Sequence, residues 1–420
     1  MTAARGLSVE EASERILGSL PRMKAERVAL DRSVYRVLSR DVVSTLTLPP
    51  WTNAAMDGYA VRADDVRGAS ADRPARLRVI ESVGAGRFPT LAVGRGEATR
   101  VMTGAPVPEG ADSVVRFEDT DRGEQQVEIR DERDAGRNVR QRGEDVAQGT
   151  VVARAGTVIS PTTVAILAAV GAGFVDVRSR PQVGIMSTGD ELVSVNEADA
   201  AYGPRIVSSN GPALAAMVRA AGGDVIDLGI APDDPEEIRD RLDSAATADL
   251  IVTSGGVSVG AHDHLRDVVA DLGAVDFWRV RMRPGSQLAF GRIGSTPWIG
   301  VPGNPVSAVV VGELFVRPAV LRMMGVSAVH RIRVAVTVGE TIAVAAGATH
   351  LLRIERDRST DPPTAFLAGG QSSHVISALA RADSLLIVPE GVTRLEPGDR
   401  AWAIPLGEGT SERQPIRADG

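Results

Sequence analysis

Residues 182–326 alternate short apolar runs with helical segments, and small residues fill three of the junctions. The middle junction, at 253–260, follows the run 250–252, which is long enough for a buried strand and too short for a helix. Its three glycines let backbone N–H groups approach a ligand closely, and a helix is expected at 262–272. This order suits an anion at the helix N-terminus, although a plain strand-to-helix turn has the same pattern.

Similar junctions lie on either side of it, at residues 187–191 and 302–305. The alternation of strands and helices predicts a parallel, doubly wound sheet. Such sheets bind ligands outside the carboxyl ends of their strands, where all three junctions fall. The candidate binding residues are Ser187, Thr188, Gly189, Asp190, Ser254, Gly255, Gly256, Ser258, Gly260, Pro302, Gly303, Asn304 and Pro305.

Carboxylates accompany the same junctions, namely Asp190, Glu191, Asp233, Asp234 and Asp263. Carboxylates beside a phosphate-binding loop favour Mg²⁺, which takes carboxylate and substrate-phosphate oxygens as ligands. Arg281, Arg283 and Arg292 add positive charge near this edge, so we expect a phosphorylated, anionic substrate. Each carboxylate can equally cap a helix, a role that would suit Asp233 and Asp263.

The other parts of the chain have a different pattern. Residues 62–145 and 330–406 consist of short apolar runs between turn residues, which is typical of small β-rich domains. Residues 146–178 resume the mixed character of residues 8–45, so we expect the first β-rich domain to be an insertion. The predicted division is 1–47 with 146–178, then 48–145, 179–326, 327–408 and a disordered tail at 409–420.

Three polar turns stand out in the β-rich insertion. Asp57 lies in a Met-Asp-Gly turn before a strand, and Thr103 follows another strand at a glycine turn. Asp145 ends the segment 137–145, which carries three arginines. An aspartate in a turn is usually a turn former, and an arginine cluster is usually a solvated surface. The alternative is a ligand site, because guanidinium groups bind phosphates and carboxylates well.

Composition excludes several classes of function. The chain has no cysteine, which rules out disulfides, thiolate zinc sites and cysteine nucleophiles. A low aromatic content of 3% and a net charge of −7 argue against nucleic-acid binding. Lys24 is the only lysine, so a catalytic lysine elsewhere is excluded. No signal core or long apolar run is present, and we expect a soluble, cytoplasmic protein without a membrane partner.

Six motifs stand in one order along nearly the whole chain: Asn53-Ala-Ala-Met-Asp-Gly-Tyr-Ala, Met102-Thr-Gly-Ala-Pro-Val-Pro, Arg142-Gly-Glu-Asp, Ser187-Thr-Gly-Asp-Glu-Leu, Ser254-Gly-Gly-Val-Ser-Val-Gly and Pro302-Gly-Asn-Pro-Val-Ser-Ala. In this series the chain resembles the molybdopterin molybdenumtransferases. These are the bacterial MoeA proteins, and the family also includes the E domain of gephyrin.

The resemblance implies insertion of molybdate into adenylylated molybdopterin (molybdopterin-AMP), with Mg²⁺ as cofactor and release of AMP. A molybdopterin adenylyltransferase would act upstream as a partner. The resemblance also implies an elongated homodimer of α/β and β-rich domains. These are a doubly wound, mostly parallel molybdopterin-binding domain, an inserted β-rich domain and a C-terminal domain resembling a β-barrel.

The family pattern also assigns roles to residues. The inserted domain of one subunit would face the α/β domain of the other and join Asp57, Thr103 and Asp145 to Glu191 and Asp263 as catalytic residues. Mg²⁺ would be held by Asp190, Glu191, Asp233 and Asp263, with Asp234 as an alternative to Asp233. Molybdate would be held by Arg283, Ser286, Arg353 and Ser373, with Ser258 beside them.

One motif departs from the family. Arg283-Pro-Gly-Ser-Gln287 stands where Lys-Pro-Gly-Lys-Pro is common, so Ser286 replaces a cation. A paralogue with altered oxyanion use, or a scaffold protein that keeps the fold, is therefore one alternative. Molybdopterin adenylylation is the other, although a stand-alone adenylyltransferase lacks the β-rich insertion and its Asp57 motif.

Overall fold

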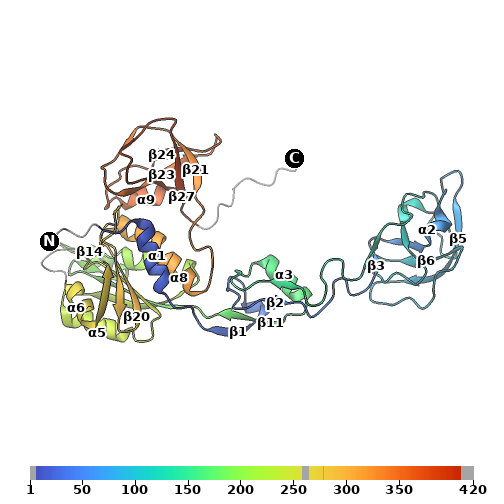
Figure 1. Ribbon diagram of the computed structural model, residues 1–420, viewed down its shortest axis with the longest axis horizontal. Helices are drawn as coiled ribbons and strands as arrows, with labels where there is room; N and C mark the ends of the chain where they lie inside the picture. Colours follow the sequence, from blue (N-terminus) through green and yellow to red (C-terminus); the bar gives the residue numbers. More distant parts are fainter. Residues whose placement is uncertain (1–5, 258–263, 278, 408–420) are drawn as a thin grey trace. The chain divides into compact units, whose positions relative to one another are not determined.

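The computed structural model describes residues 6–257, 264–277 and 279–407 (Figure 1). The chain forms two compact units. Unit 1 contains residues 1–26, 35–39 and 177–420, and unit 2 contains residues 27–34 and 40–176. The chain first passes out of unit 1 within β1 (Ala25–Ala29), rejoins it at residues 35–39, and returns finally within β11 (Phe174–Arg178). Within the described residues, no helix combines the length and the apolar character that a membrane span requires.

The core of unit 1 is a six-stranded sheet with the order β15-β12-β16-β20-β19-β17. Four neighbouring strands are parallel: β15 (Asp224–Ala231), β12 (Gln182–Thr188), β16 (Leu250–Ser254) and β20 (Thr296–Val301). The last two, β19 (Ala289–Ile293) and β17 (Gly273–Phe277), join antiparallel. The predicted mostly parallel sheet is confirmed, with an antiparallel extension at one edge.

Helices cover both faces of this sheet because side chains alternate along each strand. Leu250 and Val252 belong to a core with α1, α4 (Asn210–Ala220), α7 (Pro305–Val311) and α8 (Arg317–Met323). Ile251 belongs to a second core with α5 (Pro235–Ser244) and α6 (His264–Leu272). Buried Trp298 lies in this second core, where its indole N–H donates to Thr253 Oγ1 at 2.9 Å.

The first helix of the chain, α1 (Val9–Ser19), belongs to unit 1. Ser8 caps it, and Glu11 completes a capping box. Ala12 and Ile16 are fully buried in the core that contains α8, and the Met23 N–H donates to the Met323 carbonyl at 2.8 Å. Sequence patterns group residues 1–47 with 146–178, whereas α1 packs in unit 1. The division into four domains remains a prediction.

The C-terminal part of unit 1 is a closed β-barrel, as predicted. Its strands are β21 (Val334–Val338), β23 (Thr349–Asp357), β24 (Thr364–Leu367), β25 (Ser384–Val388) and β27 (Arg400–Pro405). The order β23-β24-β21-β27-β25 closes because β25 also pairs with β23. One further strand, β18 (Met282–Arg283), adds parallel to β23, and the helix α9 (Ile376–Arg381) precedes β25.

Unit 2 contains a five-stranded sheet with the order β7-β4-β6-β5-β8. Its strands are β4 (Gly58–Val61), β5 (Ala75–Val83), β6 (Glu97–Val101), β7 (Ser113–Arg116) and β8 (Gln126–Ile129). The short strands β2 (Val42–Val43) and β10 (Val151–Ala153) pair with each other, as do β3 (Asn53–Ala54) and β9 (Val139–Arg140). The helix α3 (Pro161–Ala169) completes the unit.

Candidate functional site

A hollow of about 710 Å³, which we call the crevice, lies at the carboxyl ends of the central parallel strands. Strand register aligns these ends, because Ser254 pairs with Ser187 on one side and with Val301 on the other. The predicted binding residues that line the crevice are Thr188, Gly189, Ser254, Gly255, Gly256, Gly303, Asn304 and Pro305. The predicted residues Glu191 and Asp233 line it as well.

Backbone geometry requires the two glycines after β16. Gly255 has φ +92°, and a Cβ added there would lie 2.5 Å from the Thr188 carbonyl oxygen. Gly256 has φ +63°, and its added Cβ would lie 2.7 Å from Leu265 Cβ. Both left-handed conformations and both close approaches favour glycine. The turn therefore packs against the end of β12, and both glycines line the crevice.

Two polar side chains organise the floor of the crevice. Asn210 Nδ2 donates to Ser254 Oγ at 2.8 Å and to the Gly303 carbonyl at 2.7 Å, which ties α4 to the loops after β16 and β20. Thr188 Oγ1 is buried and has no hydrogen-bond partner among the described residues. Asn210 is not among the residues that the sequence patterns single out. Its side chain connects two distant loops, a role that no local pattern reveals.

The acidic residues fall into different environments. The Asp233 N–H donates to Asp190 Oδ1 at 3.0 Å, which links the turns after β12 and β15. Asp234, not Asp233, caps α5, because its Oδ1 accepts from the N–H groups of Glu236 and Glu237. The Asp233 carboxylate is thus not used as a helix cap. Glu191 is exposed at the crevice.

The described residues contain no cluster of three or more histidine, aspartate or glutamate side chains arranged to hold a metal ion. The described members of the predicted Mg²⁺ set, Asp190, Glu191 and Asp233, are carboxylates, which is the oxygen chemistry that Mg²⁺ prefers. Asp263, the fourth predicted ligand, lies outside the described residues, as do Ser258 and Gly260.

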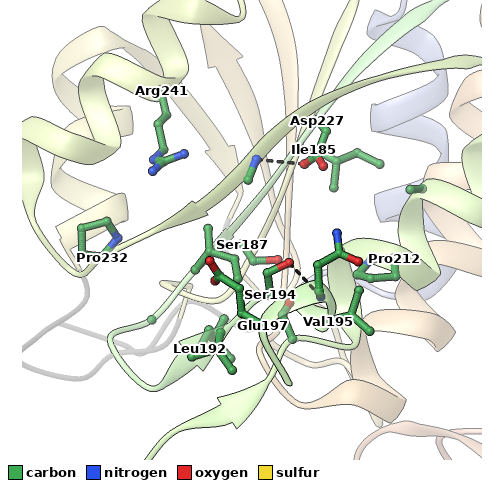
Figure 2. A pocket seen from close by; sticks show the side chains of 18 of the residues that line it. Ile185, Ser187, Leu192, Ser194, Val195, Glu197, Pro212, Asp227, Pro232 and Arg241 are labelled. Carbon is green, nitrogen blue, oxygen red and sulfur yellow. Dashed lines mark hydrogen bonds between the residues drawn. The ribbon is translucent and has the colours of Figure 1, made fainter. Parts of the chain in front are cut away.

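A second hollow of about 610 Å³, the edge hollow, adjoins the crevice through shared residues Gly189, Leu192 and Ser208. Two predicted residues, Ser187 and Asp190, line the edge hollow rather than the crevice. Figure 2 shows its lining, with Asp227 from β15, Arg241 from α5 and Ser194 from the segment after β13 (Leu192–Val193). Asp227 accepts the Gly229 N–H, and Ser194 accepts the Asn196 N–H.

A third hollow of about 690 Å³, the junction cavity, lies between the loops of the central sheet and the barrel. All four predicted molybdate residues line it, namely Arg283, Ser286, Arg353 and Ser373, and Pro302 lines it too. The β18–β23 pairing sets Arg283 against His350, three positions before Arg353 on the same strand. The Val306 N–H donates to the Ser373 carbonyl at 3.1 Å, which ties the barrel to the start of α7.

Arg353 is the most unusual residue of the cavity, because its side chain is fully buried. Its Nη2 donates to the carbonyls of Gly370 and Ser372 at 2.7 and 3.2 Å. The Gln371 side-chain amide binds both backbone groups of Arg353: its Oε1 accepts the Arg353 N–H at 2.9 Å, and its Nε2 donates to the Arg353 carbonyl at 3.1 Å. Nε and Nη1 have no hydrogen-bond partner among the described residues. Burial lowers the pKa of this guanidinium, which nevertheless stays cationic at neutral pH.

The crevice and the junction cavity share Gln287 and Asn304 in their linings. One ligand can therefore extend from backbone N–H groups in the crevice to guanidinium groups in the cavity. Such an arrangement suits a phosphorylated organic molecule at one end and a small oxyanion at the other. Sequence analysis did not select Gln287 or Gln371, although both lie beside predicted positions.

In unit 2, the predicted residues Asp57 and Thr103 lie together. Asp57 Oδ1 accepts the Thr103 N–H at 2.7 Å and the Thr103 hydroxyl at 2.8 Å. Both bonds lower the pKa of the exposed Asp57 carboxyl, and the bond from the Thr103 backbone N–H has the larger effect. Gly104, with φ +81°, shapes this turn. Asp145 is exposed and forms no described side-chain contact with either residue.

Comparison with known proteins covers all three regions of the chain. The family model "MoeA N-terminal region (domain I and II)" matches residues 7–171. The model "Probable molybdopterin binding domain" matches residues 184–322, and "MoeA C-terminal region (domain IV)" matches residues 335–406.

Similar proteins match at nearly full length. Molybdopterin molybdenumtransferase 2 of Mycobacterium tuberculosis is 37% identical over 398 residues, which covers 93% of this chain and 97% of that protein. Molybdopterin molybdenumtransferase of Staphylococcus aureus is 33% identical over 397 residues, covering 93% and 94%. The crystal structure of the molybdopterin biosynthesis MoeA protein from Pyrococcus horikoshii superimposes with a TM-score of 0.82 at 29% identity, covering 95% of this chain and 100% of that chain. On these grounds the chain belongs to the MoeA family.

Proposed function

We propose that this protein is a molybdopterin molybdenumtransferase of molybdenum cofactor biosynthesis, which inserts molybdate into adenylylated molybdopterin and releases AMP. Relatives that match 93% of the chain carry that enzyme name. The observation that carries the proposal is the buried Arg353, with two unpartnered guanidinium nitrogens on a cavity that adjoins a glycine-walled crevice.

The two hollows would divide the substrates between them. In the junction cavity, Arg353 and Arg283 supply positive charge, and Ser286 and Ser373 supply hydroxyl groups, for a tetrahedral oxyanion such as molybdate. In the crevice, backbone N–H groups and the buried Thr188 hydroxyl would bind the phosphorylated pterin. Holding both substrates at a fixed separation removes much of the entropic barrier to reaction.

Carboxylates of the same region suit Mg²⁺. Asp190, Glu191 and Asp233 would hold the ion together with Asp263, with Asp233 favoured over Asp234 because Asp234 caps α5. When bound, Mg²⁺ would neutralise phosphate charge and polarise the phosphoanhydride that is cleaved. Glu191, exposed at the crevice mouth, would hold or transfer a proton during release of AMP.

Asp57, Thr103 and Asp145 would complete the site from a second copy of the chain in a homodimer. Asp57 supports this role because two hydrogen bonds from Thr103 fix its exposed, ionised carboxylate. The proposed setting is the cytoplasm, where a molybdopterin adenylyltransferase would supply the adenylylated substrate.

The direct test supplies purified protein with adenylylated molybdopterin, Mg²⁺ and molybdate, and follows AMP release and cofactor formation. Molybdenum transfer predicts that both depend on molybdate. Consumption of ATP with plain molybdopterin would instead indicate adenylylation. An absence of either reaction would favour a scaffold, and activity with tungstate alone would indicate altered oxyanion use.

A mixing experiment tests the shared site. Asp57→Ala and Arg353→Met should each abolish turnover without changing the oligomeric state, whereas Asp72→Ala, at another exposed aspartate of unit 2, should be active. If each site combines Asp57 of one subunit with Arg353 of the other, a mixed dimer of the two inactive variants contains one intact site. Co-refolded mixtures should then recover roughly a quarter of wild-type activity, since half of the dimers are mixed. No recovery would show that Asp57 and Arg353 do not act across subunits.

A further inference from the structure

A separate pocket of about 320 Å³, which we call the basic pocket, lies where α8 meets the C-terminal barrel and the segment before β21. It is lined by Arg317 of α8, by His330 and Arg331 of the segment before β21, and by Arg356 and Arg358 of β23 and the turn after it. It shares no lining residue with the crevice or the junction cavity. Among the described residues that line it, Asp383 is the one acidic residue.

Two carboxylates face four arginines in and beside this pocket. Glu313, in the π-helical turn η4 (Gly312–Val316), is 7% exposed and is bonded through both oxygens by Arg331. Arg317 approaches the same carboxylate only at 3.8 Å. Glu313 thus has one close arginine, Arg331, and one more distant arginine, Arg317.

Asp383 is the second acid. Its Oδ1 accepts from Arg356 Nε at 3.0 Å, while Arg358 Nη2 stays 3.8 Å from Oδ2. Among the residues that the structure describes here, four guanidinium groups against two carboxylates leave an excess of two positive charges. The Arg356 side chain is only 5% exposed, so part of this charge is screened little by solvent.

The titration of neighbouring groups reflects the same excess of charge. Burial and then Arg331 lower the pKa of Arg317, against the opposing effect of Glu313. Burial, followed by Arg333 and Arg317, lowers the pKa of His330, so this ring is neutral near pH 7. Excess cationic charge in a partly buried pocket is costly unless an anion shares it.

We propose that the basic pocket binds a phosphate group, either as free phosphate or as a small phosphate ester. Arg358 supplies a guanidinium group whose only close carboxylate among the described residues is Asp383, at 3.8 Å. Arg317 supplies a second one, of which Nη1 donates to the Val329 carbonyl at 3.0 Å. Their planar donor geometry matches phosphate oxygens. The pocket also has an apolar side made by Pro405, Leu406 and Ile332, and Ile332 is 84% exposed. An ester could place its organic part against these side chains.

The test measures binding of inorganic phosphate, and separately of AMP, to the full-length protein by isothermal titration calorimetry at constant ionic strength. Arg353→Met serves as the background, so that oxyanion binding in the junction cavity does not contribute. The crevice is still intact in that background, so the basic pocket is identified by the component of saturable binding that adding Arg358→Gln weakens by about tenfold or more. Arg358→Lys should restore part of the affinity.

Arg400→Gln is the matched control, because Arg400 is an exposed arginine of β27 that does not line the pocket. It should leave binding unchanged, and circular dichroism should show that every variant is folded. Within the component of binding that depends on Arg358, tighter binding of AMP than of phosphate would identify the ligand as an ester, and equal or weaker binding of AMP would identify free phosphate. Absence of binding, or equal loss in Arg358→Gln and Arg400→Gln, would overturn the proposal.

Discussion

The crevice and the junction cavity adjoin each other, yet they are built by opposite means. The crevice is shaped by missing side chains, since Gly255 and Gly256 let the backbone turn against Thr188. The cavity is shaped by one large charged side chain, Arg353, which backbone carbonyls hold in a fully buried position. A turn of glycines is specified locally, whereas a buried arginine is tolerated only because distant segments surround it.

This contrast separates stability from function. Substitution of Gly255 or Gly256 should mainly destabilise the fold, because their left-handed backbone conformation and close contacts disfavour any side chain. Substitution of Arg353 should mainly impair oxyanion binding, because a buried charge without a paired carboxylate contributes little to folding. Substitutions at Arg353, Gly255 and Ser254 test this division, in order of decreasing expected effect.

Arg353→Met should lower molybdate-dependent turnover by about 10²–10³-fold, as is typical when one preorganised donor to an oxyanion is removed. The free energy of unfolding should stay equal or rise, because a flexible apolar side chain of similar length replaces a buried charge. Urea denaturation and the cofactor-formation assay measure the two quantities.

Arg381→Met is the control for this substitution. Arg381 donates to the Ala368 carbonyl at 2.7 Å, near the same loop, but it does not line the junction cavity. Its loss should leave turnover within about twofold of wild type. A large loss of stability in Arg353→Met with activity retained would reverse the proposed contrast.

Gly255→Ala should destabilise unit 1 by about 2–3 kcal/mol, because the added Cβ meets the Thr188 carbonyl at 2.5 Å and φ is +92°. Gly303→Ala is the control in the same crevice. Its added Cβ would lie 3.6 Å from Gly255 Cα, an ordinary contact, so we expect a change within about 0.5 kcal/mol. Equal unfolding midpoints for the two variants in urea would contradict the geometric argument.

Ser254→Ala should cost about 1 kcal/mol, because Asn210 loses one of two acceptors and keeps the Gly303 carbonyl. A double-mutant cycle with Asn210→Ala should give a coupling energy of similar size. Additive effects of the two substitutions would show that their hydrogen bond does not stabilise the crevice floor.

The smallest effect concerns an exposed charge outside both hollows. Thr103→Val removes the hydroxyl bond to Asp57 and keeps the backbone bond, so the lowered pKa of Asp57 should rise towards its ordinary value of 3.8. A lowered carboxyl pKa stabilises the fold above the unfolded-state value, and this contribution disappears as the pH falls through the folded-state value.

The stability difference between wild type and Thr103→Val should therefore shrink as the pH falls below 3.8. NMR titration of the Asp57 carboxyl carbon measures the pKa directly. An unchanged pKa in the variant would assign the whole shift to the backbone bond.

The sequence predicted the central sheet because strand and helix periodicity is local. It could not reveal that α1 packs on α8, or that Asn210 connects two loops, since these contacts join distant segments. Arg353, Ser286 and Ser373 came from the family resemblance alone, whereas Arg283 was also expected to add positive charge near the sheet edge. Nothing in residues 349–357 distinguishes an arginine that faces a cavity from one that faces solvent.

The packing of α1 has a consequence for synthesis of the chain. Ile16 and Ala12 are buried among residues that include α8, and Met23 bonds Met323, about 300 residues later. The ribosome therefore releases α1 long before its binding surface exists, and the insertion at residues 40–176 is complete first. During that interval the apolar face of α1 lacks its packing partner and is accessible to chaperones. In a truncated chain that ends before α8, this face would stay uncovered.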